Sequence, residues 1–182
     1  YMKKPIGIKK YRKFYIETAR QRVLELFFKY SEKEFSLSDV AKEARVSKAN
    51  IGGILIELEK IGFIKIERLT KIWRVKANQS NWNFIRSKIV YNLNFVYQSG
   101  LVEFLYNSYD HPKSIILFGS FRKGEDISNS DIDIAIESED FKDYKDKKLN
   151  WKECSEEKLR DLFSNIKFKT QPYIHQLATF TF

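Results

Sequence analysis

Two aspartates and a Gly-Ser pair are the residues of this chain best suited to chemistry. An apolar run from Ile115 to Phe118 ends at Gly119 and Ser120, and a second apolar run carries Asp131 and Asp133 at positions i and i+2. Side chains alternate faces along a strand, so both carboxylates are expected to point the same way. Two carboxylates on a rigid edge, facing a glycine turn with free N–H groups, suit a divalent cation that holds a nucleotide phosphate. The pattern predicts phosphoryl or nucleotidyl chemistry.

The order Gly-Ser, a short basic loop with Gly-Glu, then Ser-Asp-x-Asp resembles the nucleotidyltransferase superfamily that includes DNA polymerase beta, in particular its minimal nucleotidyltransferase branch. The loop departs from that pattern, because it reads Arg122-Lys123 where the family usually has a small residue and then arginine. The resemblance implies that Asp131 and Asp133 bind Mg²⁺ and act in catalysis. It also implies a nucleoside triphosphate bound by Gly119, Ser120, Lys123, Gly124 and Ser130.

Simpler interpretations of the same residues stand beside this one. An Asp-x-Asp pair on an edge strand can be a solvated face that discourages aggregation, and Gly-Ser after a strand is often a plain turn. The conjunction of two apolar runs, the turn and the serine before Asp131 favours the nucleotidyltransferase fold.

A third carboxylate, which the resemblance implies for catalytic members, is missing from the expected strand at 166–177. His175 lies near the place where that group is sought, and imidazole can act as a base or a metal ligand. A single histidine in an apolar strand is more often structural. Activity is therefore less securely predicted than the fold.

Positive charge is concentrated in the first part of the chain. Residues 1–79 hold 19 Lys and Arg against 9 Asp and Glu, whereas residues 80–182 hold 14 against 15. The segment from Lys3 to Lys13 contains six basic residues and no acid. When such a basic segment binds a polyanion, counterions are released, and this release favours binding. The segment is therefore predicted to contact nucleic acid, and the alternative is that it only aids solubility.

Residues 1–79 also show the order of a winged helix-turn-helix domain, and they are predicted as one nucleic-acid-binding domain. Helical spacing runs from Tyr15 to Tyr30, a short helix is expected from an N-cap at Ser38 to Ala44, and a third helix follows Ser47 with a core face of Ile51, Ile54, Leu55, Leu58 and Ile61. Gly62 ends that helix, and period-two runs at 63–68 and 72–76 predict a hairpin.

The resemblance to winged-helix proteins places the third helix in the major groove and the hairpin on the flanking backbone or minor groove. Asn50 is the best candidate for a base edge, while the basic residues mainly grip phosphates. The predicted nucleic-acid-binding residues are Lys48, Asn50, Lys65, Arg68, Lys71 and Arg74. Such domains also bind protein or a second copy of themselves, and RNA delivered to a transferase site is a further alternative.

Residues 80–182 are predicted as a second, nucleotidyltransferase-like domain. The segment from Ser80 to Tyr109 is too apolar for a solvated linker, so two helices broken at Gly100 are expected to pack on the sheet. A further helix is expected from Asn150 through Phe163. The fold class is α+β, a winged helix-turn-helix followed by a small mixed sheet with packed helices.

Composition excludes some kinds of covalent and metal site and bears on where the protein is located. One cysteine, Cys154, excludes an internal disulfide and a cysteine-based zinc site. No apolar run reaches the length of a membrane span and no leader opens the chain, so a cytoplasmic location is expected.

The sequence therefore predicts an enzyme that transfers a nucleoside monophosphate from a triphosphate to an unidentified hydroxyl, with Mg²⁺, coupled to DNA binding. The alternative is a DNA-binding regulator or antitoxin-like protein. In that case the second domain lacks activity and senses nucleotide or docks a partner such as a toxin chain. Homodimerisation is expected only from the habit of winged-helix proteins.

Overall fold

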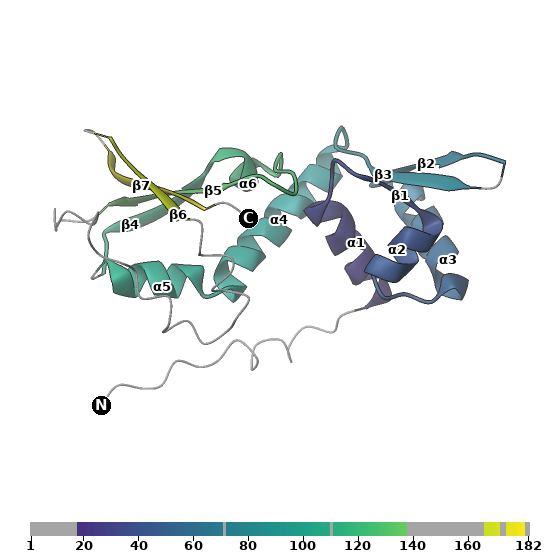
Figure 1. Ribbon diagram of the computed structural model, residues 1–182, viewed down its shortest axis with the longest axis horizontal. Helices are drawn as coiled ribbons and strands as arrows, with labels where there is room; N and C mark the ends of the chain where they lie inside the picture. The colour runs from purple at the N-terminus through teal and green to yellow at the C-terminus, as the bar shows by residue number, and fades with distance from the viewer. Residues whose placement is uncertain (1–17, 71, 110, 138–165, 172–173, 181–182) are drawn as a thin grey trace, which may run out of the picture. The chain divides into compact units, whose positions relative to one another are not determined.

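The computed structural model describes residues 18–70, 72–109, 111–137, 166–171 and 174–180 (Figure 1). The chain divides into two compact units. Among the described residues, those within 18–91 and 124–128 form one, here called the winged-helix unit, and those within 92–123 and 129–180 form the other, here called the sheet unit. The sequence placed a boundary between residues 79 and 80, whereas the two units divide within a helix, between Tyr91 and Asn92, and the later segment 124–128 belongs to the winged-helix unit.

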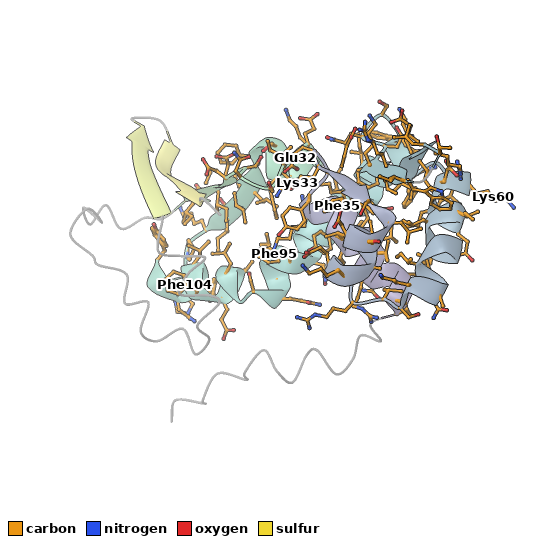
Figure 2. The ribbon with its side chains drawn as sticks, turned by 45° about the vertical axis from the view of Figure 1, so that its right-hand side comes forward. Glu32, Lys33, Phe35, Lys60, Phe95 and Phe104 are labelled. Carbon is orange, nitrogen blue, oxygen red and sulfur yellow. The ribbon has the colours of Figure 1, made fainter. Side chains whose placement is uncertain are left out.

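Among its described residues, the winged-helix unit contains three helices, the first part of a fourth, and a three-stranded antiparallel sheet of order β1-β3-β2. The first strand was not predicted; its Phe35 (Figure 2) meets Phe27 edge-on at 5.9 Å between ring centroids. The predicted element order is otherwise confirmed. The elements are α1 Ala19–Lys29, β1 Glu34–Ser36, α2 Leu37–Glu43, α3 Lys48–Lys60, β2 Ile64–Arg68 and β3 Trp73–Ala77.

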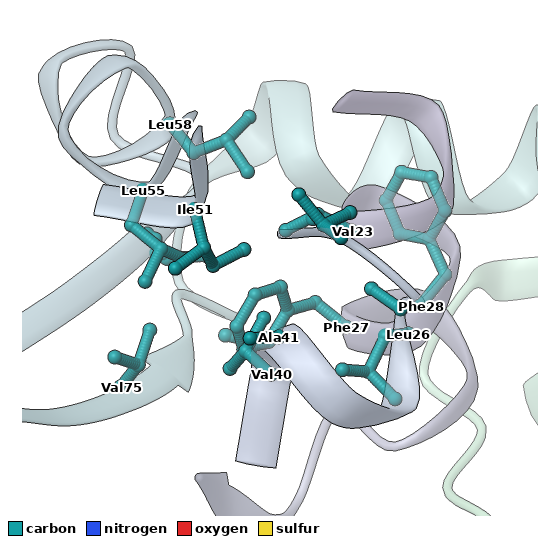
Figure 3. Packing of buried hydrophobic residues seen from close by; sticks show 14 of the residues in the cluster. Val23, Leu26, Phe27, Phe28, Val40, Ala41, Ile51, Leu55, Leu58 and Val75 are labelled. Atoms are coloured by element: carbon teal, nitrogen blue, oxygen red, sulfur yellow. The ribbon is translucent and has the colours of Figure 1, made fainter. Parts of the chain in front are cut away.

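Side chains from all three helices and from β3 fill the core of this unit (Figure 3). Val23 and Phe27 of α1 are fully buried, as are Leu55 of α3 and Val75 of β3. The predicted core face of α3 is confirmed at Ile51, Leu55 and Leu58. Ile61 is instead 44% exposed, because it is the C-cap residue and the chain leaves the helix there.

The start of α2 differs from the prediction. Ser36, and not Ser38, is its N-cap: the Ser36 hydroxyl accepts from the Asp39 N–H, and the Asp39 carboxylate accepts from the Ser36 N–H. These two hydrogen bonds give acceptors to two backbone N–H groups that would otherwise have no partner at the start of the helix. The hydrogen bonds from Ser36 lower the pKa of the Asp39 carboxyl.

Two helices follow the hairpin, as predicted, with the break at Gly100. They are α4 Trp82–Gln98 and α5 Leu101–Ser108, and Gly100 has a φ of 76°, which glycine adopts without strain. Some apolar side chains of α4 are exposed to solvent: Trp82 is 61% exposed and Val90 is 67% exposed. The predicted packing on the sheet is found at Val96, Leu101 and Leu105, which share a core with β-strand residues 132–136.

The sheet unit contains a four-stranded antiparallel sheet of order β4-β5-β7-β6 (Figure 1). Its elements are β4 Ser114–Phe118, the short helix α6 Gly119–Lys123, β5 Ile132–Glu137, β6 Ile166–Gln171 and β7 Ile174–Phe180. The core joins alternate β5 residues to α4 and α5. It contains Val96, Leu101, Leu105, Tyr109, Phe121, Ile132, Ile134 and Ile136.

Two predictions for this unit are corrected. The basic stretch after Gly119 is not an open loop but begins with the single-turn helix α6. The strand expected at 166–177 is a pair of antiparallel strands, β6 and β7. Pro172 lies between them in the sequence, and proline cannot donate a ladder hydrogen bond. The helix expected at 150–163 and Cys154 lie outside the described residues.

None of the helices among the described residues has the length and apolar character needed to span a bilayer.

Candidate functional site

Strand pairing brings the Gly-Ser turn against one of the two predicted metal-binding aspartates. β4 and β5 are antiparallel, and Phe118 at the end of β4 is the register partner of Asp133. Gly119 follows at a φ of 74°. A Cβ added there would overlap Asp133 Oδ2 and come within 2.9 Å of Asp133 Cγ, so the carboxylate lies directly against the Gly119 backbone. Glycine is required here both for the backbone angle and for the close approach.

The other predicted residues of this site lie at the same end of the sheet. Ser120 is the second residue of α6, and Ser130 and Asp131 directly precede β5. All three are half-buried. Because the end of β4 and the start of β5 are neighbours in an antiparallel pair, the two segments meet at one edge. The first N–H groups of a helix have no acceptor within it, so this edge combines amide donors with carboxylates.

The two remaining predicted nucleotide-binding residues separate. Lys123 ends α6 and is exposed, as is Arg122. Gly124 is buried in the winged-helix unit at a φ of 71°. A Cβ there would lie 3.0 Å from the Ile85 carbonyl oxygen and 3.0 Å from Ile89 Cγ1, both on α4. Packing against α4 thus accounts for the glycine at 124 without a nucleotide.

The strands that follow β5 in the sheet do not supply the third carboxylate. β7 is the strand beside β5, and the register partner of Asp133 is Thr179. Neither β6 nor β7 contains Asp or Glu, and His175 is the second residue of β7. Among the described residues no group of three His, Cys, Asp or Glu is arranged to hold a metal ion.

The donor set nevertheless fits Mg²⁺. This ion is commonly held by one or two carboxylates together with substrate phosphates and water, rather than by a complete protein cage. Asp131 and Asp133 supply the carboxylates, and the amide-rich turn at Gly119 lies beside them.

Helix α3 carries two of the predicted nucleic-acid-binding residues on an open face. Lys48 and Asn50 are exposed in its first turn. Gly52 and Gly53 follow, and a Cβ built on either meets no atom within 4 Å. Glycine inside a helix costs about 1 kcal/mol relative to alanine. In the part of the chain that the structure describes, no contact explains these two glycines.

The predicted wing residues are not equivalent. Lys65 and Arg74 are exposed and line a groove on the sheet that also includes Lys76 and two acids, Glu34 and Glu67.

The Arg68 side chain has partners within the unit. Its guanidinium forms a bidentate ion pair with Glu59 of α3 and lies 5.1 Å from the Trp73 ring centroid. Hydrogen bonding from Arg68 lowers the pKa of Glu59. This pair fastens β2 to α3. Lys71 lies outside the described residues.

Sequence reasoning did not identify Lys88, which is fully buried on α4. The spacing of residues along α4 could have indicated that Lys88 is buried. Phe84, Lys88, Asn92 and Val96 recur every four residues, and all four are buried. A lysine within an apolar helical stripe requires buried acceptors, since an unpaired charge is too costly to bury.

Comparison with known families matches residues 99–179 to the model of the nucleotidyltransferase domain. No curated protein matches the chain.

Among solved structures, that of MepR, a transcription regulator of the Staphylococcus aureus multidrug efflux pump MepA, is similar with a TM-score of 0.37 and 13% identity. The alignment covers 55% of this chain and 70% of that chain. The S. aureus MepR–DNA complex gives a TM-score of 0.35 at 16% identity, with 55% and 86% covered.

Proposed function

Because residues 99–179 match the model of the nucleotidyltransferase domain, we propose that this chain transfers a nucleoside monophosphate from a triphosphate to a hydroxyl group. The observation that carries the proposal is the register of β4 and β5, which sets the Asp133 carboxylate against the Gly119 turn. A cation-binding carboxylate and amide donors for phosphate then share one edge of the sheet.

Each residue of this edge has a separate role in the proposal. Asp131 and Asp133 hold Mg²⁺, which when bound neutralises charge on the reacting phosphate and on the leaving pyrophosphate. The amides at Gly119 and Ser120 bind phosphate oxygens and fix the triphosphate. Lys123, exposed at the end of α6, offers a cation to the same chain of phosphates.

We further propose that the winged-helix unit binds DNA through α3 and the wing. Lys48 and Asn50 are exposed on α3, and Lys65 and Arg74 are exposed on the wing. The glycines at 52 and 53 support this assignment, since a helix face without side chains allows its backbone to approach a groove closely. The two glycines lower the stability of the helix, and on this proposal they are present because DNA binding needs them, not because the fold does.

A second candidate function is supported by the residue types of β6 and β7. Without a carboxylate beside Asp133, a base for the attacking hydroxyl is not evident in either strand. The chain would then be a DNA-binding regulator whose sheet unit binds Mg²⁺ and nucleotide as a signal, or docks a partner chain, without transfer.

Calorimetric titration of ATP and GTP, each with Mg²⁺, tests the nucleotide site. The wild type is compared with the Asp131→Asn, Asp133→Asn double variant. Glu137→Gln is the matched control, because Glu137 lies at the far end of the same strand and accepts a hydrogen bond from Ser114. We expect binding by the wild type and control, and its loss in the double variant.

A transfer assay with α-labelled triphosphates separates the two candidates. Label passing from the triphosphate to protein, RNA or a small hydroxyl compound supports the transferase. Metal-dependent binding without transfer supports the nucleotide-sensing regulator. Absence of binding by the wild type would overturn the nucleotide site altogether and leave a docking role.

A further inference from the structure

Lys88 is a fully buried lysine whose ammonium group has a complete set of partners. Its Nζ donates to Ser31 Oγ at 3.0 Å and to the Asp126 carbonyl oxygen, and it lies 3.4 Å from Asp126 Oδ2. Ser31 Oγ donates in turn to the same Asp126 carbonyl at 3.1 Å. All three residues belong to the winged-helix unit.

This arrangement is expensive in free energy, because burial removes the ammonium from water and lowers the pKa of Lys88 against the attraction of Asp126. An apolar side chain would fill the same space without that penalty. A buried pair does, however, fix one backbone path by directional bonds. The geometry is therefore better explained by positioning than by stability alone.

The backbone that Lys88 fixes is the segment 124–128, which is held at two further points. Ser128 N–H donates to Glu32 Oε2 at 3.3 Å, and Glu32 lies in the turn after α1 (Figure 2). Gly124 packs against Ile85 and Ile89 of α4. The Gln79 amide donates to the Ser31 carbonyl at 2.7 Å and steadies the turn that carries Ser31.

The segment 124–128 connects the two halves of the candidate nucleotide site. It follows α6, whose first residues are Gly119 and Ser120, and it ends three residues before Asp131. We propose that Lys88 and Ser31, residues of the winged-helix unit, are positioning residues for nucleotide binding: they hold 124–128 so that Gly119 and Asp131 keep their spacing. This inference rests on the proposed nucleotide function.

The test replaces the buried pair by apolar residues, as Lys88→Met with Asp126→Leu, so that no unpaired charge remains. Ser31→Ala is a milder second variant that removes one acceptor of Lys88. Val75→Ala is the control, because Val75 is fully buried in the same unit, and its truncation weakens the fold without touching the segment. Amide hydrogen exchange and Mg·ATP affinity are measured for each at a temperature where all are folded.

We expect faster exchange at 124–128 and at 119–123 in the double variant, and an affinity for Mg·ATP lower by about tenfold or more, as for other residues that orient metal ligands. Ser31→Ala should shift both readouts in the same direction, and Val75→Ala should leave affinity within about twofold.

Equal affinities in the double variant and in Val75→Ala would overturn the inference. If the wild type binds no Mg·ATP, the nucleotide function fails. In that case amide hydrogen exchange in the double variant tests whether Lys88 positions the backbone. Unchanged exchange at 119–123 refutes this role, and faster exchange there supports it.

Discussion

The two glycines in α3 provide a prediction in which stability and binding move in opposite directions. Gly52 and Gly53 lie inside a regular helix, and a Cβ at either position has no neighbour within 4 Å. Alanine therefore adds no clash and removes the entropy cost of glycine, about 1 kcal/mol at each position. The double variant should raise the free energy of unfolding by about 2 kcal/mol.

Thermal and urea unfolding give the first half of the test. For a unit of this size, about 1 kcal/mol corresponds to a rise of about 4–8 °C in the midpoint. Gly62→Ala is the opposite control, because Gly62 has a φ of 77° and a Cβ there would lie 2.6 Å from Asn81 Nδ2. That variant should lower the midpoint, which separates helix propensity from a general preference for alanine.

Binding to a fluorescent duplex gives the second half. If α3 approaches a groove through its bare face, the added methyl groups of Gly52→Ala and Gly53→Ala should weaken binding while the protein becomes more stable. Ser87→Ala on α4 controls for the gain in stability, since the Ser87 hydroxyl donates to the Asn83 carbonyl one turn earlier in the same helix. A more stable double variant with undiminished DNA affinity would refute the close-approach explanation, and an unchanged free energy of unfolding would refute its energetic premise.

Three further outcomes follow from individual contacts. Burial raises the pKa of Tyr91 to about 12 from 10.0, so the tyrosine ionises first in the unfolded chain. Stability present below pH 10 should fall as the pH rises, with a total loss of about 2.7 kcal/mol above pH 12, and Tyr91→Phe should remove that loss in urea titrations. Gly119→Ala should cost about 1–2 kcal/mol for its backbone angle alone, and by displacing Asp133 it should abolish Mg·ATP binding in calorimetry. Ser36→Ala should lower the free energy of unfolding by about 1 kcal/mol in thermal melts, whereas Ser38→Ala should have a much smaller effect.

Local pattern was sufficient for much of the winged-helix unit. Period-two alternation located β2 and β3, and the left-handed glycines at 62 and 100 end α3 and separate α4 from α5. These features depend on residues close in sequence. The choice of Ser36 over Ser38 as the N-cap was also local, because Ser36 has Asp39 three residues later, as a capping box requires.

Other features depend on contacts that sequence spacing does not encode. The strand β1 has only three residues and exists through its pairing with β3. The meeting of Gly119 with Asp133 requires the particular register of β4 and β5. Gly124 fits a nucleotide-binding motif, yet its burial against Ile85 could be recognised only once α4 was placed beside it.

The polar residues within the buried stripe of α4 show why such contacts matter for function. Asn92 donates to the Phe121 carbonyl at 2.7 Å, and Lys88 donates to the Asp126 carbonyl, so two successive turns of one helix hold two points of a single backbone stretch. Each bond is obligatory, because a buried amide or ammonium without an acceptor would cost more than the bond contributes. The stretch between them contains the end of α6 and the start of the segment leading to Asp131. A helix whose apolar face is interrupted at these two positions thus specifies the path of the backbone from the end of α6 toward Asp131.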